Sequence, residues 1–293
     1  MKLRIGRTAT LVLMMTTLAG ARAPDGRITV VAAENFYGNV ARQIGGGRVA
    51  VASILRNRDQ DPHLFEASPA VVREIAAAQI VVYNGAGYDP WMTKVLRVAP
   101  RRGRSVIVAA DLMHEKETGN PHLWYDPATM LAVAKALAAA LAAADPAHKR
   151  DYAARLQTFV VSLAPLNKKI AAIRSKYAGA AVTASEPIAG YMASALKLRM
   201  RNRRFQRAIM NGTEPSASDI AAFERDLKTH KVRIMFYNKQ ASDNVVQRLL
   251  AVARAEHVPV VGVTETSPLG MSYQNWMSAE LDETAKALAG SSS

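Results

Sequence analysis

The sequence predicts an α/β protein with two lobes, each a mainly parallel β-sheet flanked by helices, joined by one long and kinked helix. Short apolar segments alternate with helical segments in both halves of the chain, as in parallel sheets covered on both faces. The longest helical pattern, residues 146–177, lies between these halves. The 293 residues are enough for two domains of ordinary size.

The first half of the chain alternates regularly between expected strands and helices. Buried strands are expected at residues 27–33, 48–54, 80–83 and 105–109. Helices are expected at residues 36–44, 68–77, 90–98 and 126–144. Ser68 with Pro69 is a favoured combination at a helix start, because the serine can cap the helix and proline suits its first turn.

The central helical segment carries an apolar stripe with spacings of three and four residues, typical of a helix with one packed face. Its members are Phe159, Leu163, Leu166, Ile170, Ile173 and Tyr177. Pro165 interrupts the pattern and predicts a kink within the preceding turn. We therefore expect a lobe at residues 24–145, a linker helix at 146–178 and a second lobe at 179–293.

The second half repeats the order of strand, loop and helix. Strands are expected at residues 180–184, 232–237 and 258–263. Helices are expected at residues 185–196, 216–230, 242–256 and 273–288. Ser216 or Ser218 is the expected cap of the second of these helices.

Residues 1–23 have the features of a secretory signal peptide. Basic residues precede a short apolar run, and Ala21-Arg22-Ala23 fits an A-x-A cleavage site. The apolar run is too short to span a bilayer comfortably. No cysteine follows it that could carry a lipid anchor. We expect a periplasmic protein that is exported without a lipid anchor.

Cysteine is absent and the net charge is strongly positive. A metal site would therefore have to use His, Asp and Glu, and the fold can contain no disulfide. The charge is +14, or +10 without the four basic residues of the signal segment, and it concentrates in residues 101–104 and 197–207. Only Phe205 offers an aromatic ring there, so these clusters favour a solvated face, an acidic partner or anionic lipid over nucleic acid.

Two Pro-His segments mark the candidate functional site. They are Asp61-Pro62-His63 and Asn120-Pro121-His122, and proline keeps both histidines on stiff, non-helical segments. Glu186 and Glu265 each follow a short apolar strand. Ligands of open α/β sheets bind at the carboxyl ends of strands, so these four residues could converge on a metal ion across a cleft.

Sequence motifs of several enzyme classes are absent. His114-Glu115-Lys116-Glu117-Thr118 lacks the second histidine of a zinc-protease helix. The sequence also contains no G-x-S-x-G motif, phosphate-binding Walker loop or spaced dinucleotide fingerprint.

These segments resemble the metal-binding solute-binding proteins of bacterial zinc/manganese ABC importers, over nearly the whole mature chain. The resemblance rests on the two Pro-His segments, Ser185-Glu186, Glu214-Pro215-Ser216-Ala217 and Thr264-Glu265-Thr266. It implies two α/β lobes joined by a long helix, with one metal ion held between them.

The resemblance also implies a ligand set and a role. The family's ligand positions match His63, His122, Glu186 and Glu265, although the fourth ligand is usually Asp and the His-rich loop of many zinc members is absent. The expected ligand is Zn²⁺ or Mn²⁺, with Fe²⁺ as a further candidate, and the expected partner is the importer's membrane permease. A monomer that binds no nucleic acid and has no enzyme activity is expected.

Three alternatives stay open at this stage. A secreted metal-dependent hydrolase would need an open coordination position and a general base. A cell-adhesion protein or basic binding module would use the histidines only incidentally. A protein with the same fold could also bind a metal chelate in a wider cleft.

Overall fold

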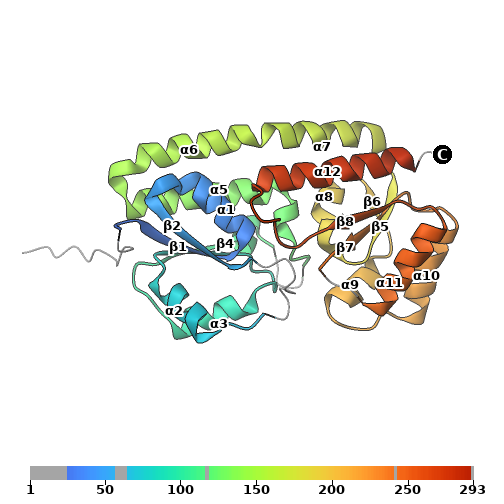
Figure 1. Cartoon of the computed structure of the whole chain (residues 1–293), viewed down its shortest axis with the longest axis horizontal. Coiled ribbons are helices and arrows are strands. Elements are labelled where there is room, and N and C mark those ends of the chain that lie inside the picture. The colour runs from blue at the N-terminus through green and yellow to red at the C-terminus, as the bar shows by residue number, and fades with distance from the viewer. Residues whose placement is uncertain (1–24, 57–64, 116–118, 241–242, 292–293) are drawn as a thin grey trace, which may run out of the picture.

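The computed structural model describes residues 25–56, 65–115, 119–240 and 243–291, which form two lobes built around parallel sheets (Figure 1). The first sheet has the strand order β2-β1-β3-β4, and all its pairs are parallel. Its strands are β1 (Ile28–Glu34), β2 (Val49–Leu55), β3 (Ile80–Tyr83) and β4 (Ser105–Val108). The predicted strands of this lobe are therefore confirmed, to within one residue at each end.

Helices of the first lobe begin where the sequence provides start signals. They are α1 (Asn35–Gly45), η1 (Gly46–Arg48), α2 (Pro69–Ala77), α3 (Pro90–Val98), α4 (Ala109–Met113), η3 (Leu123–Tyr125) and α5 (Pro127–Ala144). The Ser68 side chain accepts a hydrogen bond from the Val71 backbone N–H at 3.4 Å, which confirms the predicted cap. The short helix α4 was not predicted, since its five residues are too few to show a helical period.

The second sheet repeats the pattern with the order β6-β5-β7-β8. Its strands are β5 (Ala181–Ala184), β6 (Arg199–Met200), β7 (Met235–Asn238) and β8 (Val260–Val263). Its helices are η5 (Pro187–Ala189), α8 (Gly190–Ala195), α9 (Arg203–Met210), α10 (Ala217–Lys228), α11 (Asn244–Ala255) and α12 (Tyr273–Gly290). Strand β6 and helix α9 were not predicted, because both lie in the basic run and strand β6 has only two residues.

The connector is a long helix interrupted once. After η4 (Pro146–His148), α6 (Lys149–Ser162) and α7 (Ala164–Tyr177) are separated at Leu163. Pro165 lies in the first turn of α7, where its missing N–H costs no internal hydrogen bond, and the interruption falls in the turn before it, as the sequence predicted. Figure 1 shows α6 and α7 extending along both lobes with α12 beside them, and Lys169 Nζ of α7 lies 2.5 Å from Asp282 of α12.

One apolar core includes residues of both lobes. Trp124 and Trp276, from opposite halves of the sequence, are both buried in it. Helix α5 is long and apolar enough to cross a membrane by length and composition, but its buried face, which includes Met130 and Leu137, packs into this core. The shared core fixes the lobes against each other and thereby defines the position of the interlobe site.

One arginine of the basic cluster at residues 101–104 forms hydrogen bonds that stabilise the fold. The Arg104 guanidinium donates to the carbonyl groups of Ile75, Ala76, Ala78 and Ala99 at 2.9–3.2 Å. These carbonyls include that of Ala76 in the last turn of α2, where carbonyl groups lack the usual partner four residues ahead. Arg104 therefore has a structural role that the sequence analysis did not predict.

Candidate metal centre

Three of the four predicted site residues converge between the lobes. Glu186 follows β5, Glu265 follows β8, and His122 lies in the loop before η3. Their potential ligand atoms all lie within 4.8 Å of one another. The three residues are 0–4% exposed. A neutral imidazole and two carboxylates at this spacing match the donor set and charge that a divalent transition-metal ion requires.

The fourth predicted residue, His63, lies outside the described residues, so its place in the site remains a prediction. The segments on either side of it are described. They place β2 before it and Ser68, the cap of α2, after it. The described chain therefore stops shortly after the carboxyl end of a strand and resumes just before a helix.

Asn120 orients the His122 ring. Its Nδ2 donates to the Pro187 carbonyl oxygen at 2.7 Å, which fixes the amide orientation and directs Oδ1 toward the imidazole. This Oδ1 lies 2.6 Å from His122 Nδ1 and 3.2 Å from the His122 backbone nitrogen. An amide oxygen can only accept, so Nδ1 carries the proton and the lone pair of Nε2 is available to a metal ion.

Two side chains that the sequence did not single out position the carboxylates. The Tyr88 hydroxyl donates to Glu265 Oε2 at 2.8 Å. Asn238 Nδ2 lies 2.6 Å from Glu265 Oε1 and 3.4 Å from Glu186 Oε1. Burial and the neighbouring Glu265 carboxylate raise the pKa of Tyr88, which keeps its hydroxyl protonated as a donor. Asn238 is the last residue of β7, so the rule that identified the glutamates also applies to it.

A buried polar group beneath the His122 loop supports its backbone. Asn84 Nδ2 donates to the Pro121 carbonyl oxygen at 2.7 Å, and Asn84 Oδ1 accepts from the Tyr37 hydroxyl at 2.8 Å. Asp89 in turn accepts from the Asn84 and Gly85 backbone N–H groups at 2.7 and 2.8 Å. The histidine loop is therefore held at both Pro121 and Asn120.

Tyr125, three residues after His122, connects the two lobes. Its hydroxyl oxygen lies 2.9 Å from the Thr264 carbonyl oxygen and 2.7 Å from Glu280 Oε2. Glu280 also accepts from the Trp276 indole N–H at 2.8 Å. This network ties the histidine segment to the residue that precedes Glu265. Tyr125 therefore helps to hold the two lobes together.

We expect Glu280→Gln to remove a specific part of the pH dependence of stability. Burial raises the pKa of Glu280 to about 7, from 4.5 when it is unperturbed. The folded state therefore favours the protonated acid, and the stability this provides is lost as pH rises from 4.5 to about 7. Because Glu280 is only partly buried, the loss should be on the order of 2 kcal/mol.

Urea unfolding of the metal-free protein at pH values below and above this window would measure the effect. As pH rises, the unfolding free energy of the wild type should fall relative to that of Glu280→Gln. A difference that stays constant with pH would contradict the assignment.

Gly190→Ala is expected to weaken metal binding without weakening the fold. An added Cβ at Gly190 would lie 2.8 Å from Asn120 Nδ2, too close for the amide to keep its position. Gly190 has helical φ and ψ, where alanine is the more stabilising residue. If His122 is a ligand, as the sequence predicts, displacing its hydrogen-bond partner should cost about tenfold in metal affinity.

Competition with a fluorescent zinc chelator, paired with thermal unfolding of the metal-free variant, would separate the two effects. Unchanged affinity would show that Asn120 does not hold His122 in place. Ser194→Ala, one turn further along α8, is the matched control, because its side chain makes no hydrogen bond within the described chain.

Comparison with known proteins gives consistent matches over most of the chain. The sequence profile of the family described as zinc-uptake complex component A, periplasmic, matches residues 30–287. A putative metal-binding protein of Treponema pallidum is 24% identical, and the match covers 89% of this chain and 87% of that protein. The metal ABC transporter substrate-binding lipoprotein SloC of Streptococcus mutans is 24% identical, with 92% of each chain covered.

Solved structures share the fold. The periplasmic zinc-binding protein TroA of Treponema pallidum superposes with a TM-score of 0.76 at 20% identity, covering 90% of this chain and 99% of that one. A manganese-bound periplasmic metal-binding protein of Candidatus Liberibacter asiaticus gives a TM-score of 0.73 at 17% identity, covering 89% of this chain and all of that one. At these identities the structural likeness establishes the two-lobe fold.

Proposed function

Because the chain belongs to the zinc-uptake complex component A family of periplasmic proteins, we propose that it is the extracytoplasmic solute-binding protein of an ABC metal importer. It captures one divalent transition-metal ion between its lobes and delivers the ion to a membrane permease. The observation that carries this proposal is the buried convergence of His122, Glu186 and Glu265. Several relatives are named as metal or manganese ABC transporter substrate-binding lipoproteins, which supports the same role.

The ligand set proposed for the ion is His63, His122, Glu186 and Glu265. The two carboxylates balance the charge of a divalent cation, and the imidazoles stay neutral. Oxygen-rich coordination suits Mn²⁺, whereas the general affinity order of divalent ions places Zn²⁺ above Mn²⁺. We therefore expect both ions to bind, with Zn²⁺ tighter in direct competition.

Delivery follows from the arrangement of the lobes. The proposed ligands come from both lobes, at residues 24–145 and 179–293, so the ion itself joins them. The linker at residues 146–178 extends along both lobes, which restricts opening to a small motion. A permease that separates the lobes would pull apart the ligand set and release the ion.

The hydrolase alternative is not favoured, because the family consists of transport proteins and four protein ligands would leave a zinc ion no open position. The adhesin alternative gains no specific support from the described residues. It would leave the buried convergence of three potential ligands unexplained.

Native mass spectrometry of chelator-stripped protein offered Zn²⁺ or Mn²⁺ would test the proposal. Wild type should retain one ion per chain, and His122→Ala should retain none. Glu283→Gln, which alters an exposed acid of α12, is the matched control and should behave as wild type. His63→Ala tests the ligand outside the described residues. Absence of a stoichiometric ion, or equal retention by His122→Ala, would overturn the proposal.

A further inference from the structure

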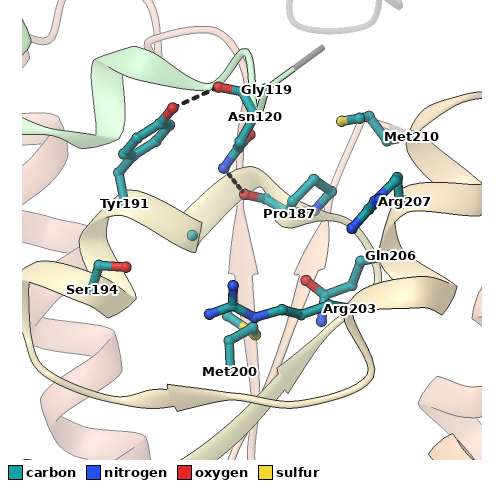
Figure 2. A pocket seen from close by; sticks show the side chains of 11 residues that line it. Gly119, Asn120, Pro187, Tyr191, Ser194, Met200, Arg203, Gln206, Arg207 and Met210 are labelled. Atoms are coloured by element: carbon teal, nitrogen blue, oxygen red, sulfur yellow. Dashed lines mark hydrogen bonds between the residues drawn. The ribbon is translucent and has the colours of Figure 1, made fainter. Parts of the chain in front are cut away.

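We propose that the second lobe carries a separate binding site for a small oxyanion, a carboxylate or phosphate, in the pocket between α8 and α9 (Figure 2). This site goes beyond metal capture and does not require the metal to be bound. The pocket has a volume of about 390 Å³, within the range of small-molecule sites. Gly119 and Asn120 of the first lobe complete its lining.

The pocket contains two guanidinium groups that lack a counter-charge within the described chain. Arg203 and Arg207 both line it, and their spacing of four residues places them on one face of α9. Figure 2 shows both side chains reaching from α9 toward the pocket interior, below and beside Pro187.

Two neighbouring arginines of the same basic run do have acidic partners. Arg201 forms a two-pronged ion pair with Asp226 at 2.7 and 2.9 Å, and Arg204 lies 3.4 Å from Asp219. Those ion pairs neutralise part of the positive charge of residues 197–207. Arg203 and Arg207 have no such pair within the described chain, and their guanidinium groups match the geometry of carboxylate and phosphate oxygens.

The other lining residues favour a compact organic anion. Gln206 is 98% buried beside the arginines, with Nε2 donating to the Arg201 carbonyl oxygen at 2.5 Å, so its position is fixed. Met200 and Met210 supply an adaptable apolar surface. Together with the Ser194 hydroxyl on the α8 side, they would suit a short carbon chain carrying carboxylates.

One wall of the pocket is also part of the metal site. Asn120 lines the pocket and holds His122 through the hydrogen bonds described above. The Tyr191 hydroxyl donates to the Asn120 carbonyl oxygen at 2.8 Å, and burial together with the nearby Glu115 carboxylate raises the pKa of Tyr191, which keeps this donor protonated. The oxyanion pocket and the proposed metal site would therefore share Asn120.

Isothermal titration calorimetry at low ionic strength would test the site. Metal is first removed with a chelator, and the chelator is then removed by dialysis because its own carboxylates could occupy the site. The metal-free protein is titrated with inorganic phosphate and, separately, with tricarballylate. We expect saturable binding of one anion per chain, weakened about tenfold or more in the Arg203→Ala/Arg207→Ala double variant. The probe that binds more tightly would show whether the site prefers a phosphate or a small organic acid.

Arg204→Ala is the matched control, because it removes a charge from the same helix outside the pocket lining. It should bind the tighter probe within about twofold of wild type. Equal weakening by Arg204→Ala would assign the effect to diffuse surface charge and overturn the proposal, as would the absence of saturable binding to both probes. Since the titration uses metal-free protein, its result tests the anion site independently of the proposed role in metal transport.

Discussion

Glu186→Gln is expected to weaken zinc binding by more than about 100-fold while leaving the metal-free protein at least as stable as the wild type. The loss follows because glutamine removes a negative charge from the proposed ligand set, and its amide is a poorer ligand. The retained stability has a separate cause. Glu186 and Glu265 offer oxygens within 4.8 Å of His122 and of each other, so two buried like charges repel when no cation lies between them.

Thermal unfolding with and without Zn²⁺ would show both effects in one experiment. Wild type should gain stability on binding, by about 4 kcal/mol when free zinc is 1,000 times the dissociation constant. Glu186→Gln should gain almost none, and its metal-free melting temperature should equal or exceed that of wild type. A metal-free variant that unfolds well below wild type would show that Glu186 has a structural role instead.

Glu265→Gln should give little or no gain in the stability of the metal-free protein. Glu265 accepts hydrogen bonds from both the Tyr88 hydroxyl and the Asn238 amide, on opposite sides of the carboxylate. Glutamine can offer an acceptor to only one of these donors, so relief of repulsion is offset by a lost hydrogen bond.

The converging residues could be predicted from the sequence because each obeys a local rule. His122 follows a proline, and Glu186 and Glu265 follow short apolar strands whose carboxyl ends meet at one edge of a sheet. The alternating pattern and the proline kink likewise depend on neighbouring residues. These features survive in the folded protein because they are set locally.

The supporting contacts could not be predicted in the same way. Tyr88 reaches Glu265 across 177 residues of sequence, and Asn120 reaches Pro187 across 67. Such pairs exist only once the two lobes face each other. In the basic run, the same residue type serves as ion-pair partner at Arg201 and as pocket lining at Arg207, and only the folded arrangement distinguishes them.

The largest expected loss of stability comes from Trp124→Ala. Trp124 is fully buried, and its ring centroid lies 4.8 Å from that of Phe36, 4.9 Å from that of Tyr88 and 5.2 Å from that of His122. Replacing it by alanine would leave a cavity among these rings and should cost about 3–5 kcal/mol. His122 would lose one wall that holds its imidazole, so zinc affinity should fall as well.

Trp124→Phe shows how much of the loss comes from the removed side-chain volume and how much from the indole N–H. The indole N–H of Trp124 is buried and finds no hydrogen-bond partner within the described chain, so phenylalanine removes an unsatisfied donor while keeping an aromatic ring. Its cost should be near 1 kcal/mol, roughly a quarter of the alanine effect. Urea unfolding of the metal-free proteins measures both values. If alanine cost no more than phenylalanine, the aromatic cluster could not be what fixes the histidine segment, and that role would pass to the Asn120 and Asn84 hydrogen bonds.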